Sequence, residues 1–248
     1  MPLWLEAGGW GFIAASALLL GSALGWFICF SPKVVAYVMA FGSGVLFAAL
    51  SFDLVGDALA QASMAWVAGG FMAGAAGFSL INYWLNTPGV KHRKRSRRQQ
   101  PAARNTGVAI AAGTLLDGLP ESMAIGLLVA SGGKLSLATI AAIFISNIPE
   151  ALSSTAGMRR AGHSGWFMLQ LWGGIAILSG VFAVIGAVFF GSAPEHIKAL
   201  ITCVAAGGIF AMVVETMIPE AFAETHELSG LITALGFIVA VAMQALEN

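Results

Sequence analysis

Two Pro-Glu pairs stand inside apolar stretches, in LLDGLPESMAIG (residues 115–126) and ISNIPEALSS (residues 145–154). Each Glu follows a polar residue by four positions: Asp117 precedes Glu121, and Ser146 precedes Glu150. Residues four apart share one face of a helix. Each proline removes a helical hydrogen bond and frees a carbonyl oxygen one turn earlier. The pattern predicts two kinked helices that present several oxygen ligands.

These carboxylates need a counter-charge. A carboxylate at bilayer depth costs roughly 2.5–3.5 kcal/mol on insertion scales, and neither apolar stretch contains Lys or Arg. Protons or a bound cation must therefore neutralise the acids, and oxygen ligands suit hard divalent metals. We predict a metal site formed by Asp117, Glu121, Ser146 and Glu150. For one pair alone, the alternative is a proline kink beside a protonated, structural Glu.

Other polar residues extend this site towards both faces of the membrane. Asp53 and Asp57 lie one turn apart at one end of an apolar stretch, and acids cluster again after Glu215. The sequence thus predicts an acidic line from an outer mouth to an inner mouth. The predicted pathway residues are Asp53, Asp57, Asn147, Glu215, Glu220 and His226.

The elements that position these residues are membrane-spanning helices. Of the 248 residues, 58% are hydrophobic and only 10% charged, against about 25% charged in soluble domains. We expect an all-α polytopic membrane protein in a single domain, residues 1–248, with the fourth and seventh spans weakened in hydropathy by their acids. The eight predicted spans are 8–29, 34–56, 64–86, 106–130, 135–157, 165–190, 197–219 and 228–246.

The basic residues set the expected orientation. Ten of the 12 Lys and Arg fall in the loops after the first, third and fifth spans, and most of these lie in residues 87–105. The positive-inside rule makes these loops cytoplasmic and puts both termini outside. The basic loop could contact anionic lipid or nucleic acid; we interpret it as a topology signal and expect no nucleic-acid partner.

Two internal similarities predict inverted repeats. The two Pro-Glu motifs superpose on one another, on spans that run in opposite directions. GVLFAALSFDLVGDA in the second span matches GGIFAMVVETMIPEA in the seventh, which places Phe47 on Phe210 and Asp57 on Glu220. Opposed repeats with interrupted helices are typical of secondary transporters.

At these motifs the chain resembles the ZIP (Zrt/Irt-like) family of divalent metal transporters along nearly its whole length. The His-Asn-x-Pro-Glu-Gly motif of that family stands here as Asp117 to Ser122, and its second Pro-Glu motif as Ser146 to Ala151. The resemblance implies one metal site at the four residues predicted above. The family's second site maps to Gly118, Asn147 and Ala183, which have lost its ligands.

This resemblance implies transport of a divalent cation, Zn²⁺, Mn²⁺ or Fe²⁺, towards the cytoplasm, with the ion as substrate. We expect no organic cofactor and no enzymatic activity, because no nucleophile–His pair is present. The alternatives are a non-transporting metal sensor or a proton-linked transporter of another solute. Short loops favour a plasma or inner membrane, and Gly-rich spans permit a homodimer within the lipid.

Overall fold

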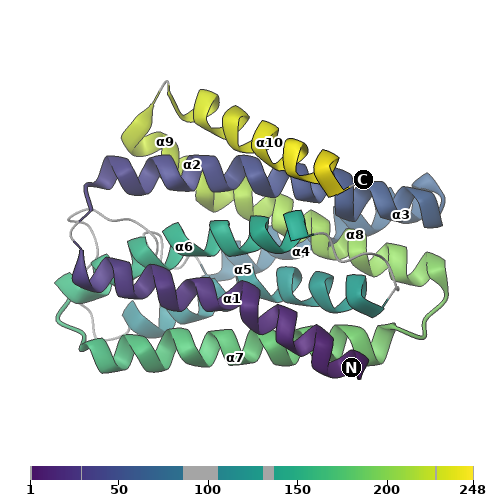
Figure 1. Ribbon diagram of the computed structural model, residues 1–248, viewed down its shortest axis with the longest axis horizontal. Coiled ribbons are helices and arrows are strands. Elements are labelled where there is room, and N and C mark those ends of the chain that lie inside the picture. Colours follow the sequence, from purple (N-terminus) through teal and green to yellow (C-terminus); the bar gives the residue numbers. More distant parts are fainter. Residues whose placement is uncertain (1, 29, 86–105, 131–136, 227, 248) are drawn as a thin grey trace.

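The computed structural model describes residues 2–28, 30–85, 106–130, 137–226 and 228–247, and these contain no strand. They form eight helical spans that run back and forth, with both ends of the chain at one end of the molecule (Figure 1). The predicted all-α polytopic membrane class is confirmed. The spans are α1 (Leu3–Phe27), α2 (Pro32–Ala49) with η1 (Leu50–Val55) and α3 (Gly56–Gln61), α4 (Met64–Leu85), α5 (Thr106–Ala130), α6 (Leu137–Arg160), α7 (Gly165–Phe190), α8 (Glu195–Met212) with η2 (Val213–Met217) and α9 (Ile218–Thr225), and α10 (Leu228–Glu247).

Span α6 is the one that hydropathy alone would miss. Seven described spans are long and apolar enough to cross a bilayer, and α6 is not among them. Its 24 residues nevertheless extend about 36 Å at about 1.5 Å per residue, more than the ~30 Å hydrocarbon core. The expected weakness of the fourth span is confirmed, with a mean hydropathy of 1.2. For the seventh it is wrong: the mean is 2.2, because the acids gather near one end.

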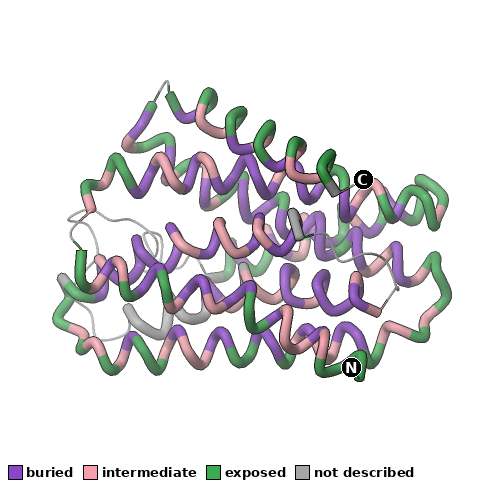
Figure 2. The backbone as a smooth tube through the Cα atoms, viewed as in Figure 1, coloured by how far each residue is buried: buried purple, intermediate pink, exposed green. Residues whose placement is uncertain are grey.

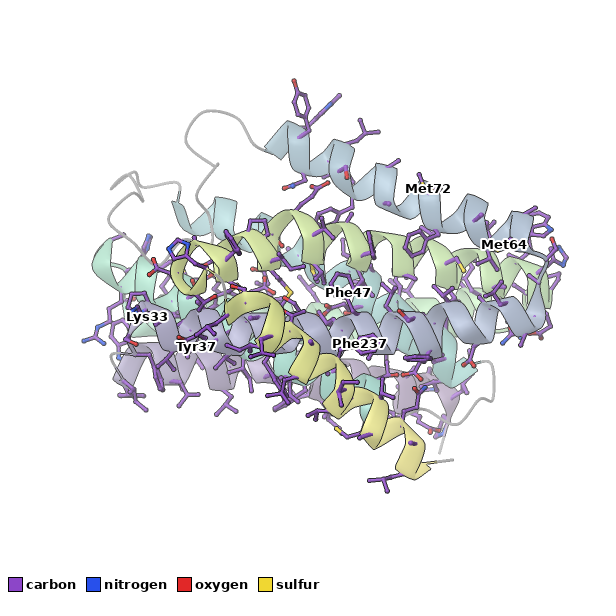
Figure 3. All side chains as sticks on the ribbon, turned by 90° about the horizontal axis from the view of Figure 1, so that it is seen from above. Lys33, Tyr37, Phe47, Met64, Met72 and Phe237 are labelled. Carbon is purple, nitrogen blue, oxygen red and sulfur yellow. The ribbon has the colours of Figure 1, made fainter. Side chains whose placement is uncertain are left out.

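Two groups of helices make up the molecule. In one, α1 packs on α6 and α7, and α5 packs on α7; in the other, α2 packs on α10 and α4 on α8. The groups meet where α6 packs on α2 and where α5 packs on α8. Helix α10 lies on the outside, over α2, and is largely exposed along its outer side (Figure 2), and α4 lies along one edge of the molecule (Figure 3). Figure 3 also marks the two ends of the bundle, with Lys33 at one and Met64 at the other.

The apolar core lies between α2, α8 and the central helices α5 and α6. Met39, Leu46, Ile125, Ile143 and Val213 are among its buried side chains. Both prolines of the Pro-Glu pairs lie inside helices, Pro120 in α5 and Pro149 in α6, and each helix continues through its proline. The basic loop at residues 87–105 lies outside the described residues, and the single-domain assignment of residues 1–248 stays a prediction.

The second and seventh spans share an irregularity at equivalent positions. Helix α2 passes into the π-helical segment η1 at Leu50, and α8 passes into the π-helical segment η2 at Val213. The alignment of the two similar sequences places Leu50 on Val213. Phe47 and Phe210, equivalent under that alignment, are in contact, with ring centroids 5.5 Å apart. Because α2 and α8 run in opposite directions, the repeat is inverted.

Glycines let both repeated spans approach their partners at the edge of the molecule. A Cβ on Gly44 would lie 1.8 Å from the carbonyl oxygen of Thr233 in α10, and one on Gly207 would lie 1.9 Å from that of Phe71 in α4. The two glycines are equivalent under the same alignment, and their partners are equivalent to within one position. The same helix–helix contact therefore occurs twice, once in each repeat.

Candidate cation-binding site

One face of α6 carries a line of buried polar side chains. Thr139, Ser146, Glu150 and Ser153 follow one another at steps of seven, four and three positions, a spacing that keeps side chains on one side of a helix. All four are buried. This polar face explains the low hydropathy of α6, and it is accommodated because α6 lies inside the bundle, packed against α1 and α2.

Carboxylates from the repeated spans close both ends of this line. The Thr139 hydroxyl donates a hydrogen bond to Asp53 in η1, which is buried. At the other end, the Ser153 hydroxyl donates to Oε1 of Glu220 in α9 at 2.8 Å. The six residues, named the α6 seam below, are Asp53, Thr139, Ser146, Glu150, Ser153 and Glu220.

The middle of the seam faces α2. A Cβ on Gly42 would lie 3.3 Å from the Cα of Ser146, so nothing larger than glycine fits there without a shift. Ser146 donates to the carbonyl oxygen of Ile143 on its own helix at 2.9 Å. That bond leaves lone pairs on the hydroxyl oxygen, which can accept further bonds. The seam thus places oxygen-bearing side chains along one face of α6, with about two helical turns between Thr139 and Ser146.

Glu121, the central acid of α5, is buried and lines a different cavity. Asn147 and Ser179 share this cavity, and Asn147 also donates to the carbonyl oxygen of Ala14 at 3.3 Å. The volume open to the centre of a water molecule is about 10 Å³, close to the smallest that can hold one water. Glu121 and Asn147 are therefore brought together on the side of α6 that faces α1.

The structure describes three of the four predicted metal ligands, Glu121, Ser146 and Glu150, and all three are buried. Ser146 lies against Gly42 of α2, and Glu121 lines the cavity beside α1. The side chain of Asp117 lies outside the described part of the chain. Among the described side chains, no three His, Cys, Asp or Glu are close enough to hold a metal ion. The four-residue metal site stays a prediction.

The predicted pathway residues fall in different environments. Asp53 and Glu220 belong to the seam, whereas Asp57 is exposed in α3 and Asn147 faces α1. Glu215 in η2 accepts hydrogen bonds from Ser79 and Asn82 of α4. His226 ends α9 with a positive φ of 44° and packs edge-on against Phe222. Its neighbour Glu227 lies outside the described residues.

A second, larger cavity of about 270 Å³ lies between α4, α5 and α8. Pro120, Met123, Phe78 and Ile201 are among its lining residues, all of which are apolar. It therefore offers a cation no side-chain ligand, although it lies directly beside the Pro-Glu pair of α5. The polar chemistry described for α5 lies on the other side of that helix.

Sequence reasoning missed the hydroxyl and amide partners of the acids. These are Thr139, Ser153, Ser79, Asn82 and Gln244. Thr139 and Ser153 fall on the helical face of Ser146 and Glu150, so their heptad-like spacing could have predicted that they line the same face. The amides had a signal too, because the inverted repeat relates Asn82 to Gln244 to within one position.

No family model matches the chain. A curated protein of Arabidopsis thaliana named "Putative zinc transporter" is 28% identical over 237 residues. The aligned region covers 94% of this chain and 37% of the Arabidopsis protein, so the chain spans little more than a third of that relative's length. The similarity thus extends over nearly the whole of this sequence.

Proposed function

We propose that the protein carries a divalent metal cation across the membrane along the α6 seam. The observation that carries this proposal is the seam itself, in which buried Glu150 lies between buried hydroxyls and a carboxylate stands at each end. No Lys or Arg occurs in α6 before Arg159. Because buried acids must be neutralised, a cation or protons supply the missing charge.

Hydroxyl groups of the seam can either donate a hydrogen bond to a carboxylate or coordinate a cation through their oxygen. Thr139 and Ser153 each donate to a carboxylate in the structure, and each hydroxyl oxygen keeps lone pairs. A passing cation would attract the carboxylate and turn the hydroxyl lone pair towards itself. At each end of the seam, a hydrogen bond is then replaced by a metal–oxygen contact.

We assign the tightest binding to Asp117, Glu121, Ser146 and Glu150, the two Pro-Glu motifs taken together. This set offers oxygen ligands and no imidazole, which suits Mn²⁺ and Fe²⁺. Carboxylates also bind zinc, and the name of the Arabidopsis relative supports zinc as a substrate. Asp53, Asp57, Asn147, Glu215, Glu220 and His226 are proposed to guide the ion to and from this site.

The proposed direction is towards the cytoplasm, in a plasma or inner membrane with both termini outside. The support is the charge distribution: Lys33 stands at the start of α2 and Arg159 at the end of α6, whereas Lys198 stands at the start of α8, at the opposite end of these antiparallel spans. The positive-inside rule then makes the Lys33 end cytoplasmic. Under this orientation Asp53 is at the outer end of the seam and Glu220 at the inner end.

Uptake of Zn²⁺, Mn²⁺, Fe²⁺ and Cd²⁺ into liposomes tests the proposal. Glu150→Gln and Glu121→Gln should each reduce the initial rate at least tenfold, because a neutral amide cannot compensate the charge of the ion. Glu6→Gln, at an acid in the first turn of α1, should leave the rate unchanged. Wild-type uptake by Glu150→Gln would refute the seam. Metal binding by the purified protein without any flux would favour the sensor alternative.

A further inference from the structure

Two hydrogen bonds between an acid and an amide occupy corresponding places in the two repeats. The side-chain amide of Gln244 in α10 donates to Oδ1 of Asp53 in η1. The amide of Asn82 in α4 donates to Oε2 of Glu215 in η2 at 2.7 Å. Both acids lie in π-helical segments, and both amides lie near the carboxyl end of a helix at the edge of the molecule.

The inverted repeat relates the two pairs. The alignment that places Gly44 on Gly207 also places the start of η1 on the start of η2. Phe71 and Thr233 are the residues that Gly207 and Gly44 contact. The difference in residue number between Asn82 and Gln244 is the same as that between Phe71 and Thr233. Because the repeats run in opposite directions, one acid–amide pair lies towards each end of the bundle. Asp53 and Glu215 fall one position apart under that alignment, as Asn82 and Gln244 do, so the two pairs correspond to within one residue.

The two acid–amide pairs differ in how exposed the acid is and in which helix supplies the hydroxyl that also donates to it. Asp53 is 7% exposed, and Thr139 of α6, from the other group of helices, donates to it. Glu215 is exposed, and Ser79 and Asn82, which donate to it, both belong to α4. Asp53 is thus covered by α6, whereas Glu215 is exposed and contacts only α4 among the hydrogen-bond partners described.

We infer that Gln244 and Asn82 are equivalent positioning residues of two gates that close in turn, with the Asp53 gate closed in this structure. The inference rests on the proposed transport function and adds the residues that orient its gate acids. Exchange of the two repeats between their conformations would bury Glu215 and expose Asp53. Each amide keeps its acid oriented in both states, and Thr139 supplies the contact that is made only when the Asp53 gate is closed.

This arrangement makes the two amides act in opposite directions. Loss of the amide donor costs the most free energy in the state in which the acid is buried. In the state in which the acid is exposed, water replaces the lost donor. Loss of the Gln244 amide therefore disfavours the present state, in which Asp53 is buried. Loss of the Asn82 amide disfavours the alternate state, in which Glu215 would be buried. A merely structural role would shift both variants in the same direction or shift neither.

Carboxylate labelling tests the inference on the purified full chain in nanodiscs. A water-soluble carbodiimide with glycine ethyl ester would be followed by mass spectrometry, which reads Asp53 and Glu215 separately. In the wild type, Glu215 should react several-fold faster than Asp53. Gln244→Met should raise labelling of Asp53 and lower that of Glu215 several-fold, and Asn82→Leu should further protect Asp53. Gln170→Leu, at an exposed amide of α7, should change neither rate.

Thr139→Val keeps the side-chain shape and should shift labelling of Asp53 and Glu215 in the same direction as Gln244→Met. If Gln244→Met fails to fold, this second variant still tests the inference. Shifts of Gln244→Met and Asn82→Leu in one direction, or no shift in either folded variant, would overturn the inference. Because labelling needs no metal, opposite shifts in a protein that takes up no metal would support the paired gates and refute the proposed cargo.

Discussion

Adjacent serines on α6 have different surroundings although they look alike in the sequence. Ser153 donates to Glu220 at 2.8 Å. Ser154 is also fully buried, but its hydroxyl has no hydrogen-bond partner among the described residues. A buried hydroxyl without a partner costs free energy, whereas a satisfied one contributes. The two positions therefore form a natural matched pair.

We expect Ser153→Ala to slow metal uptake several-fold, because Glu220 would lose the donor that orients it at the end of the seam. Ser154→Ala should leave uptake unchanged and should be neutral or slightly stabilising. Uptake into liposomes and thermal unfolding in detergent would measure the two effects. Equal losses of uptake in both variants would mean that Ser153 acts only through packing.

Trp172 ties three helices together through a short hydrogen-bond chain. Its indole N–H donates to Thr155 of α6 at 2.9 Å, and Thr155 donates to Ser22 of α1 at 3.1 Å. Trp172→Phe should lower the free energy of unfolding by about 1–3 kcal/mol, since it leaves a buried acceptor unsatisfied. Circular dichroism during thermal unfolding would report the loss. Trp166→Phe, at an indole that is 67% exposed, should be nearly neutral.

At this scale the sequence predicted the acids well and their partners poorly. Buried positions for Glu121 and Glu150 could be expected, because carboxylates beside prolines in apolar stretches turn inward. Thr139 and Ser153, by contrast, contact acids on other helices, and the four-residue metal site stays a prediction. The rotation of one helix about its axis relative to another depends on side-chain packing, which no single motif encodes.

At the scale of the helices, tight contacts between α4 and α8 set how closely the second group packs. A Cβ on Gly74 would lie 1.9 Å from the carbonyl oxygen of Val204, whereas one on Gly69, on the same helix, meets nothing within 4 Å. Gly74→Ala should lower the free energy of unfolding by about 1–3 kcal/mol, the usual cost of overpacking. Gly69→Ala should be neutral or stabilising, because alanine favours helices.

Thermal unfolding of both variants in one detergent would measure this difference. A Gly74→Ala protein as stable as Gly69→Ala would show that α4 and α8 can move apart without loss. All the described spans except α6 could be predicted from hydropathy, and the inverted relation could be predicted from the match between the second and seventh spans. The π-helical segments could not, because the single extra residue that makes a π-bulge leaves no mark in an apolar sequence.

At the scale of the whole molecule, the eight antiparallel spans put both termini on one side. With Lys33 and the basic loop of residues 87–105 inside, both termini should face the outside. Epitope tags at residues 1 and 248 should be reached by antibodies on intact cells or spheroplasts, whereas a tag within 87–105 should be reached only after permeabilisation. The reverse pattern would invert the proposed direction of transport.

The two repeated spans are also the longest of the described spans, with 30 and 31 residues, or about 45 Å at about 1.5 Å per residue. A bilayer with a ~30 Å hydrocarbon core can accommodate them only by tilt, by local thickening or by helix ends that project into the headgroups. Because one long span crosses outward and the other inward, this hydrophobic mismatch acts alike on both leaflets. Bilayer thickness should therefore change how fast the two gates alternate without favouring either of them.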